Sequence, residues 1–183
     1  MHHYANCYGV QVGEPVRRKE SEFRNEVSVR NAVRIALSQP ECAAVLLLFD
    51  GEDDCPAERS KQVGAWAQSE AGTVPCEVVL AYREYETWFL ASLESLRGSC
   101  RIRDDAIAPA DPESRRDAKG ALEAFMPSGT SYSPTIHQQK LSAVFDLALA
   151  HQRNRSFRKL TKAVGVLLRG LQQPLPAWPP DGW

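Results

Sequence analysis

The sequence predicts a mixed α/β protein with a small, mostly parallel sheet flanked by helices and a helical C-terminal half. The run Ala43 to Phe49 is continuously apolar between turn-forming flanks, which is typical of a strand buried on both faces. A helical pattern and a second apolar run, 76–81, follow it, and this strand–helix–strand order favours a right-handed crossover between parallel strands. Apolar residues at helical spacing dominate the chain after residue 85.

The N-terminal elements follow from periodicity and from prolines. Residues 8–16 alternate weakly and are expected to form a strand that ends at Pro15. A helix is expected over the second half of 23–37, closed before Pro40. Between the two apolar strands, Asp54-Cys55-Pro56 opens a helix because proline suits the first helical position, and this helix is expected to stop near Gly72.

Four helical segments are predicted in the C-terminal half. The first carries one apolar stripe from Tyr85 to Leu96. The second begins at Asp111-Pro112, an N-cap followed by proline, and ends at Pro127. The third begins at Ser133-Pro134, and the last runs from about Ser156 to Gly170.

The length of 183 residues favours one domain. We therefore predict a single domain over 1–183, with a sheet-containing core at about 8–96 and a helical part at about 111–170. The tail, 171–183, is rich in proline and is expected to be irregular, with Trp178 and Trp183 available to pin it to the body.

Composition favours a cytoplasmic protein without a membrane span. The longest apolar run is far too short to cross a bilayer, and the N-terminus has no secretory-signal pattern. The five cysteines include no C-x-x-C pair, which indicates reduced thiols rather than a disulfide framework or a zinc site.

The first candidate site is the acidic loop after the first apolar strand. Five acids and no base lie between Asp50 and Glu58. Ligands of open α/β sheets bind beyond the carboxyl ends of the strands, and crowded carboxylates there favour a hard divalent cation. We predict Asp50, Glu52 and Asp54 as ligands of Mg²⁺ or Mn²⁺, with Gly51 allowing the turn. The alternative is an exposed acidic turn in which Asp54 caps the next helix.

The end of the second strand supplies a further acid. Glu84 or Glu86 is expected to reach the same edge of the sheet as Asp50 and to act with it, and Glu84 is the one we assign. The alternative is a helix N-terminus that favours acids because of its dipole. Asp117 and Lys119 do not face each other at their spacing. A solvated face is the favoured interpretation for them, and the alternative is that one of them reaches the acidic edge.

The second candidate site is the basic last helix. Six bases and no acid lie between His151 and Gly170. We predict that Arg155, Arg158 and Lys159 hold a nucleic-acid backbone, while the alternative is a solvated face that only keeps the protein soluble.

Five stretches in this order resemble one family of bacterial proteins. They are Leu-Leu-Phe-Asp-Gly-Glu-Asp-Asp-Cys-Pro (47–56), Arg-Glu-Tyr-Glu-Thr-Trp-Phe-Leu-Ala (83–91), Asp-Ala-Lys-Gly (117–120), Tyr-Ser-Pro-Thr (132–135) and Arg-Ser-Phe-Arg-Lys-Leu (155–160). The pattern resembles domain of unknown function 4276, which is grouped with Toprim-like domains, over roughly 16–168.

The resemblance implies a Toprim-like fold with a Mg²⁺ site, in which an Asp-x-Asp pair falls on Asp50 and Glu52 with Asp54 as a further acid. Members of the family usually begin with a strand ending in Glu-Gly. This chain has no such strand, and its Glu14 follows Gly13 in the opposite order.

Three functions follow from these features. The first is a Toprim-like, metal-dependent nuclease or phosphodiesterase with Asp50, Glu52 and Glu84 as catalytic residues, acting in antiphage defence beside an ATPase partner. The second, which the missing Glu-Gly strand favours, is a degenerate module that binds protein or nucleic acid without cutting it. The third is a small-molecule phosphohydrolase with Asp50 as nucleophile.

Overall fold

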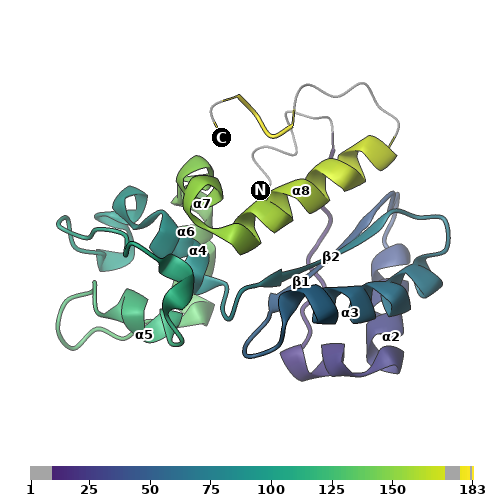
Figure 1. Ribbon diagram of the computed structural model, residues 1–183, viewed down its shortest axis with the longest axis horizontal. Helices are drawn as coiled ribbons and strands as arrows, with labels where there is room; N and C mark the ends of the chain where they lie inside the picture. Colours follow the sequence, from purple (N-terminus) through teal and green to yellow (C-terminus); the bar gives the residue numbers. More distant parts are fainter. Residues whose placement is uncertain (1–9, 172–177, 182) are drawn as a thin grey trace. The chain divides into compact units, whose positions relative to one another are not determined.

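A computed structural model describes residues 10–171, 178–181 and 183 of the chain. Figure 1 shows the elements in chain order. They are the 3₁₀ helix η1 (Glu20–Arg24), α2 (Glu26–Leu37), β1 (Val45–Asp50), α3 (Pro56–Ala71), β2 (Cys76–Ala81), α4 (Glu86–Ala91), the 3₁₀ helices η2 (Leu93–Leu96), η3 (Ser99–Arg101) and η4 (Pro112–Ser114), α5 (Ala118–Glu123), the π-helix η5 (Pro134–Gln138), α6 (Gln139–Val144), α7 (Leu147–Arg153) and α8 (Arg155–Gly170).

The chain forms two compact units, each assembled from separate stretches. The first unit consists of Met1–Phe49, Asp54–Leu80 and Leu160–Asp181, and the second consists of Asp50–Asp53, Ala81–Lys159 and Gly182–Trp183. The backbone passes from one unit to the other inside β1, β2 and α8. The last residue of each strand, Asp50 or Ala81, therefore already belongs to the second unit.

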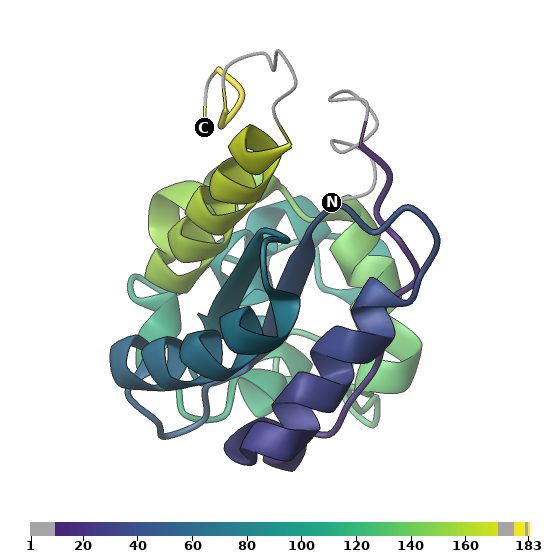
Figure 2. The same ribbon diagram turned by 90° about the vertical axis from the view of Figure 1, so that its right-hand side faces the viewer.

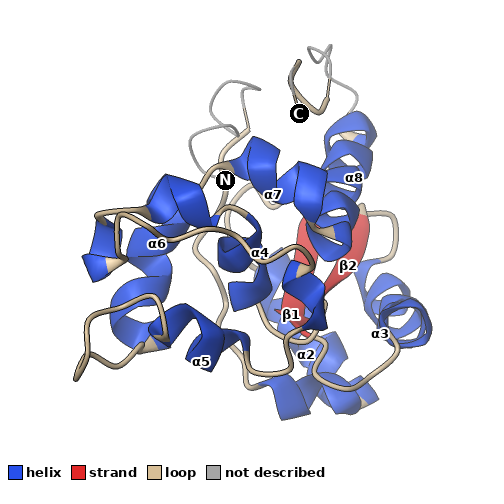
Figure 3. Cartoon of the chain, turned by 60° about the vertical axis from the view of Figure 1, so that its left-hand side comes forward, coloured by secondary structure: helices blue, strands red, loops and turns tan. Residues whose placement is uncertain are grey.

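The strands β1 and β2 pair in a two-stranded parallel sheet, which Figure 3 shows in red. Near its start, Val45 donates its N–H to the carbonyl of Pro75 at 2.9 Å, and just beyond its end Gly51 donates to Ala81 at 2.8 Å. Four successive residues of β2, 78–81, are buried, so both faces of this strand are covered. The predicted strand–helix–strand unit is confirmed, with α3 running from Pro56 to a C-cap at Gly72.

The core of the first unit lies between the sheet and its helices. Helices α2 and α3 cover one face of the strand pair, and the Leu160–Gly170 part of α8 lies on the other (Figures 1 and 2). Between α2, α3 and the sheet pack Phe23, Val29, Val33, Val45, Leu47, Phe49, Val63, Ala67, Ala71, Val78 and Leu80. The rings of Phe23 and Phe49 stack with centroids 4.4 Å apart, which joins η1 to β1.

Three expectations about single elements are corrected. Residues 10–16 form no strand, and Tyr8 lies outside the described residues. Helix α2 is longer than expected, because Asn25 caps it by accepting the N–H of Ser28 at 3.1 Å. The helix expected from Asp111 to Pro127 is two short ones, η4 and α5, since Asp117 begins the second by accepting the N–H of Gly120 at 2.8 Å.

The helix expected from Ser133 is also divided. Its first turns are η5 and α6, and the chain then becomes extended at Phe145. Asp146 caps a new helix, α7, by accepting the N–H of Leu149 at 3.0 Å. As expected, Trp178 pins part of the tail, because its indole N–H donates to the carbonyl of Thr161 at 2.7 Å.

Two further observations bear on the class of protein. Among the described residues, no helix is long and apolar enough to cross a membrane. Cys42, Cys55, Cys76 and Cys100 are free thiols, while Cys7 lies outside the described residues.

A pair of valines on α2 tests the assignment of the core. Val33 is fully buried and Val27 on the same helix is 65% exposed. Val33→Ala removes buried methyl groups and leaves a cavity, so we expect it to lower the free energy of unfolding by about 2 kcal/mol. Val27→Ala should change it by less than about 0.5 kcal/mol. Urea unfolding of the two variants measures both values, and equal losses would contradict this packing.

Candidate functional site

The backbone turns sharply where the two strands end. Glu52 has a φ of 46° and Arg83 a φ of 63°, values that residues other than glycine seldom adopt. The two are joined, since the N–H of Glu52 donates to the carbonyl of Arg83 at 2.9 Å. The left-handed residue of the turn after β1 is therefore Glu52, and not Gly51 as the sequence suggested. Strained backbone of this kind concentrates at functional sites.

Asp50 is the last residue of β1 and belongs to the second unit. Its Oδ1 accepts the N–H of Tyr85 at 2.8 Å. Burial raises the pKa of Asp50 to about 6. The hydrogen bond from the Tyr85 N–H and the charge of Lys119 lower this pKa, while the charges of Glu86 and Glu84 raise it. The site therefore contains a carboxyl group that changes charge close to neutral pH.

Glu84 joins the end of β2 to the start of α5. Its Oε2 accepts the backbone N–H groups of Ala118 at 2.7 Å and of Lys119 at 3.2 Å, which are unpaired donors of the first turn of that helix. Its Oε1 accepts a hydrogen bond from the ammonium of Lys119. Both oxygens of Glu84 thus fix the place of Lys119.

Glu86 is a carboxylate with no exposure to solvent. Its Oε1 accepts the hydroxyl of Tyr132 at 2.8 Å and the amide of Gln138 at 3.3 Å. Gln138 lies on the π-helix η5, a rare wide turn that is frequent at functional sites. The other oxygen, Oε2, has no hydrogen-bond partner among the described residues and lies 3.6 Å from the Lys119 ammonium.

These residues form one electrostatic group, which we call the Asp50 cluster: Asp50, Glu84, Glu86, Lys119 and Tyr132. Burial lowers the pKa of Lys119, but its hydrogen bond to Glu84 and the charges of Glu86, Glu84 and Asp50 outweigh burial and raise it. Burial and the neighbouring Glu86 raise the pKa of Tyr132, so its hydroxyl remains a proton donor. Three carboxylates in this cluster face one ammonium group, which leaves a formal excess of negative charge.

Tyr85 and Trp88, which flank Glu86 in the sequence, hold this part of the backbone through ring contacts and hydrogen bonds. The ring of Tyr85 lies 4.7 Å from that of Trp88, and its hydroxyl lies 3.0 Å from the Ser142 hydroxyl. The Trp88 indole N–H donates to Ser156 at 2.8 Å, and Ser156 in turn donates to the buried Asn154. The start of α8 is therefore tied to α4, the helix that carries Glu86.

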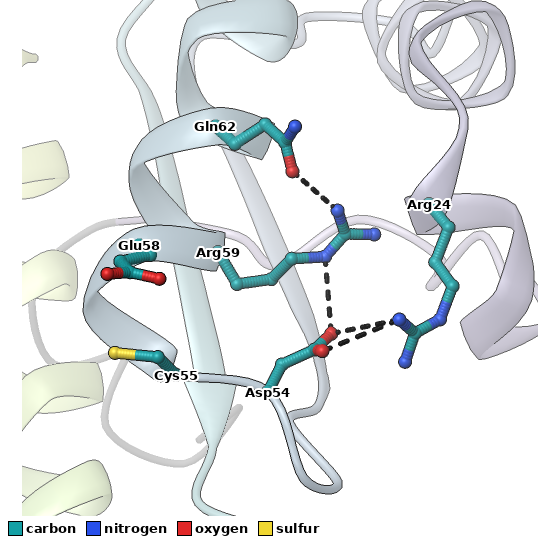
Figure 4. Close-up of a pocket in the computed structure, with 6 residues that line it drawn as sticks. All are labelled: Arg24, Asp54, Cys55, Glu58, Arg59 and Gln62. Atoms are coloured by element: carbon teal, nitrogen blue, oxygen red, sulfur yellow. Dashed lines mark hydrogen bonds and ion pairs between the residues drawn. The ribbon is translucent and has the colours of Figure 1, made fainter.

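Asp54 does not belong to the same compact unit as Asp50 and Glu84. Asp54 belongs to the first unit, where its carboxylate pairs with Arg24 at 3.2 Å and with Arg59 at 3.5 Å. Figure 4 shows the pairs at an open hollow of about 420 Å³ that Cys55, Glu58 and Gln62 complete. Glu52 in the second unit is exposed.

The predicted nucleic-acid contacts lie at the start of α8. Arg155, Arg158 and Lys159 belong to the second unit and are all exposed. Arg158 donates to the carbonyls of His151 and Gln152, both at 3.0 Å, and so caps the C-terminal end of α7.

No group of three or more acids, histidines and cysteines within the described residues is arranged to hold a metal ion. Two carboxylates do meet at one cation, since Glu84 Oε1 and Glu86 Oε2 both face the Lys119 ammonium. In this structure the two glutamates therefore share one cation position, which the Lys119 ammonium occupies.

Sequence reasoning did not assign Lys119 or Tyr132 to the site. For Lys119 the sequence favours a solvated face over contact with the acidic edge, and it indicates no role for Tyr132. Both lie in stretches that carry the family resemblance, 117–120 and 132–135. The stretches 47–56 and 83–91 supply Asp50, Glu84 and Glu86, so four of the five stretches meet in one cluster. That joint pattern was the available signal.

The fold and the cluster define a small α/β protein with a coupled group of carboxylates and a lysine at the carboxyl ends of parallel strands. The chain belongs to the family described as Domain of unknown function (DUF4276), whose sequence model matches residues 3–165. No curated protein and no solved structure matches the chain.

The raised pKa of Asp50 predicts a pH dependence of stability. Since its pKa of about 6 in the folded chain exceeds the ordinary 3.8, folding favours the protonated carboxyl. This stabilising contribution is complete below about pH 4 and is lost as the pH rises through 6. Asp50→Asn is neutral at every pH, so its free energy of unfolding relative to the wild type should rise by about 2 kcal/mol between about pH 4 and 7. Urea unfolding across this range measures the difference, and a constant difference would contradict the assignment.

The hydrogen bond between Tyr132 and Glu86 is testable by a double-mutant cycle. Tyr132→Phe removes a donor from a buried carboxylate, and we expect a loss of about 2 kcal/mol in the free energy of unfolding. In the Glu86→Gln background the same change removes only a bond between neutral groups, at a cost of about 1 kcal/mol. Equal losses in both backgrounds would show that Tyr132 does not bond to an ionised Glu86.

Proposed function

We propose that the protein is a metal-dependent phosphodiesterase that acts on nucleic acid, with the Asp50 cluster as its reaction site. The observation that carries the proposal is the meeting of Glu84 and Glu86 at one cation position beside Asp50. Carboxylates gathered at the carboxyl ends of parallel strands, with a formal excess of negative charge, favour a divalent cation.

The donor set of the cluster fits a cation that is held only partly by protein. Mg²⁺ is commonly bound by one or two carboxylates, with water and phosphate oxygens as its other ligands. Glu84 and Glu86 are such a pair, and the buried Oε2 of Glu86 lacks a hydrogen-bond partner among the described residues. A bound Mg²⁺ or Mn²⁺ would supply Lewis-acid chemistry and a more acidic water.

Asp50 is suited to proton transfer in this reaction. A general base works best when its pKa lies near the working pH, and the pKa of Asp50 is about 6. The N–H of Tyr85 holds one carboxylate oxygen in place, which leaves the other to accept a proton from water. We assign the role of general base to Asp50 and metal binding to Glu84 and Glu86. Glu52 and Asp54, which the sequence also suggested as ligands, are assigned no contact with the reacting atoms.

The substrate class follows from the basic start of α8. Arg155, Arg158 and Lys159 are exposed and belong to the same unit as the Asp50 cluster. Cations of this kind bind the phosphate backbone without reading its sequence, and their binding weakens as salt rises. The Toprim-like ancestry and a role in antiphage defence beside an ATPase partner belong to the proposal and are supported by the family resemblance. A cytoplasmic location also belongs to the proposal and is supported by the cysteine pattern.

A second candidate function is a module that binds protein or nucleic acid without cutting it. One observation favours it. Every carboxylate of the Asp50 cluster already has a protein partner, and no ready group of three metal ligands exists among the described residues. This candidate predicts salt-sensitive binding that is indifferent to metal.

A nuclease assay tests the proposal. Labelled single- and double-stranded DNA and RNA are incubated with the protein and about 5 mM Mg²⁺ or Mn²⁺, ions that bind through few protein ligands. We expect cleavage that EDTA abolishes. Asp50→Asn should reduce the rate by about 10²-fold or more, because it removes the base. Glu84→Gln should reduce it comparably by weakening metal binding.

Glu52→Gln is the matched control, because Glu52 is an acid of the same loop with an exposed side chain. It should leave the rate within about threefold of the wild type. Binding of these nucleic acids that persists in EDTA, without cleavage under any condition, would remove the first function and support the second.

A further inference from the structure

We propose that Lys119 is an internal counter-cation, which occupies the divalent-ion position of the Asp50 cluster and leaves it when metal binds. The inference rests on the proposed function in one respect, namely that a divalent cation binds at Glu84 and Glu86. It adds a mechanism of control: the protein's own ammonium competes with the metal.

The two carboxylates around Lys119 are both held in place without it. Glu84 is bonded to the backbone N–H groups of Ala118 and Lys119, and Glu86 to the side chains of Tyr132 and Gln138. The cation position is therefore defined by fixed acids, and its present occupant, the Lys119 ammonium, contacts one oxygen of each.

The burial of Glu86 favours a cation next to its Oε2 atom. Its side chain has no exposure to solvent, and an ionised carboxylate buried in this way is strongly destabilising unless a positive charge pairs with it. The Lys119 ammonium lies 3.6 Å from Glu86 Oε2, too far for a hydrogen bond, so that oxygen is only partly satisfied. A metal ion that coordinates this oxygen directly would satisfy it better.

Lys119 is able to leave. Its side chain is 37% exposed, whereas that of Glu86 is 0% exposed, so the lysine can turn its ammonium into water on its four-carbon stem. Glu84 would keep its bonds to the N-terminus of α5 during this movement, since they involve backbone atoms and its other oxygen. The exchange then needs only a side-chain rotation.

Competition of this kind lowers the apparent affinity for metal. When only a fraction of molecules has the site open, the apparent dissociation constant rises by the inverse of that fraction. It also lets the chain fold without metal, because the Lys119 ammonium supplies a positive charge to Glu84 and Glu86. The site therefore has two states, one closed by lysine and one loaded with a divalent ion.

Titration of the protein with Mn²⁺ in the absence of nucleic acid tests the exchange. Binding is followed by calorimetry or by the paramagnetic resonance signal of free Mn²⁺. Lys119→Met keeps the length of the side chain and removes its charge, so we expect the dissociation constant for Mn²⁺ to fall at least about tenfold. Lys119→Arg keeps the charge and should bind as weakly as the wild type, within about threefold. Lys140→Met, an exposed lysine of the same unit, is the control and should change nothing.

A second readout covers the case in which Lys119→Met is too unstable to titrate. Mn²⁺ that binds the folded variant must raise its melting temperature, and the rise should exceed that of the wild type. Adding Glu86→Gln to Lys119→Met removes the buried charge and should abolish the extra rise. Mn²⁺ affinity or stabilisation in Lys119→Met that does not exceed the wild-type value would overturn the exchange.

The exchange and the nuclease function fail in different ways. Tighter Mn²⁺ binding by Lys119→Met in a protein that cleaves no nucleic acid would support the exchange and remove only the catalytic function. Metal-dependent cleavage by a wild-type protein whose Mn²⁺ affinity is unchanged in Lys119→Met would keep the function and overturn the exchange.

Discussion

The second unit is organised around the burial of one carboxylate, Glu86. A charged group without contact to solvent needs both hydrogen bonds and a counter-charge, and three parts of the chain supply them. Tyr132 and Gln138 donate to one of its oxygens, and Lys119 lies against the other. Glu86 thereby holds together three segments of the second unit: the loop before η5, the π-helix η5 and the start of α5.

The sheet, which has two strands among the described residues, positions the acids of this unit. Its strands enter the second unit at Asp50 and Ala81, and the left-handed residues Glu52 and Arg83 turn the chain immediately afterwards. The turn after β2 directs Glu84 to the N-terminus of α5 and Glu86 to the interior. A parallel pair of strands thus gives two fixed exits, and the acids that leave them are close because the strands are hydrogen-bonded neighbours.

The site that the sequence outlined and the site in the structure overlap in Asp50 and Glu84. Both come directly after strands that strong local signals define, so their place at the edge of the sheet was predictable. For Lys119 the sequence favours a solvated face over contact with the acidic edge, because its partner Glu84 is 35 positions away and no periodicity links them. Asp54 shows the converse: it is four residues from Asp50, yet Arg24 and Arg59 pair with it in the first unit.

The sequence alone determined the parts of this protein that depend on neighbouring residues. An apolar run between turn formers predicted β1, a proline and a glycine predicted the bounds of α3, and the crowding of acids after β1 pointed to a candidate site. Only the tertiary structure decided which acids share a cation, which one is buried, and why Asp50 has a pKa near neutrality. The physical reason is that charge pairing and desolvation depend on distance in space, which local sequence does not encode.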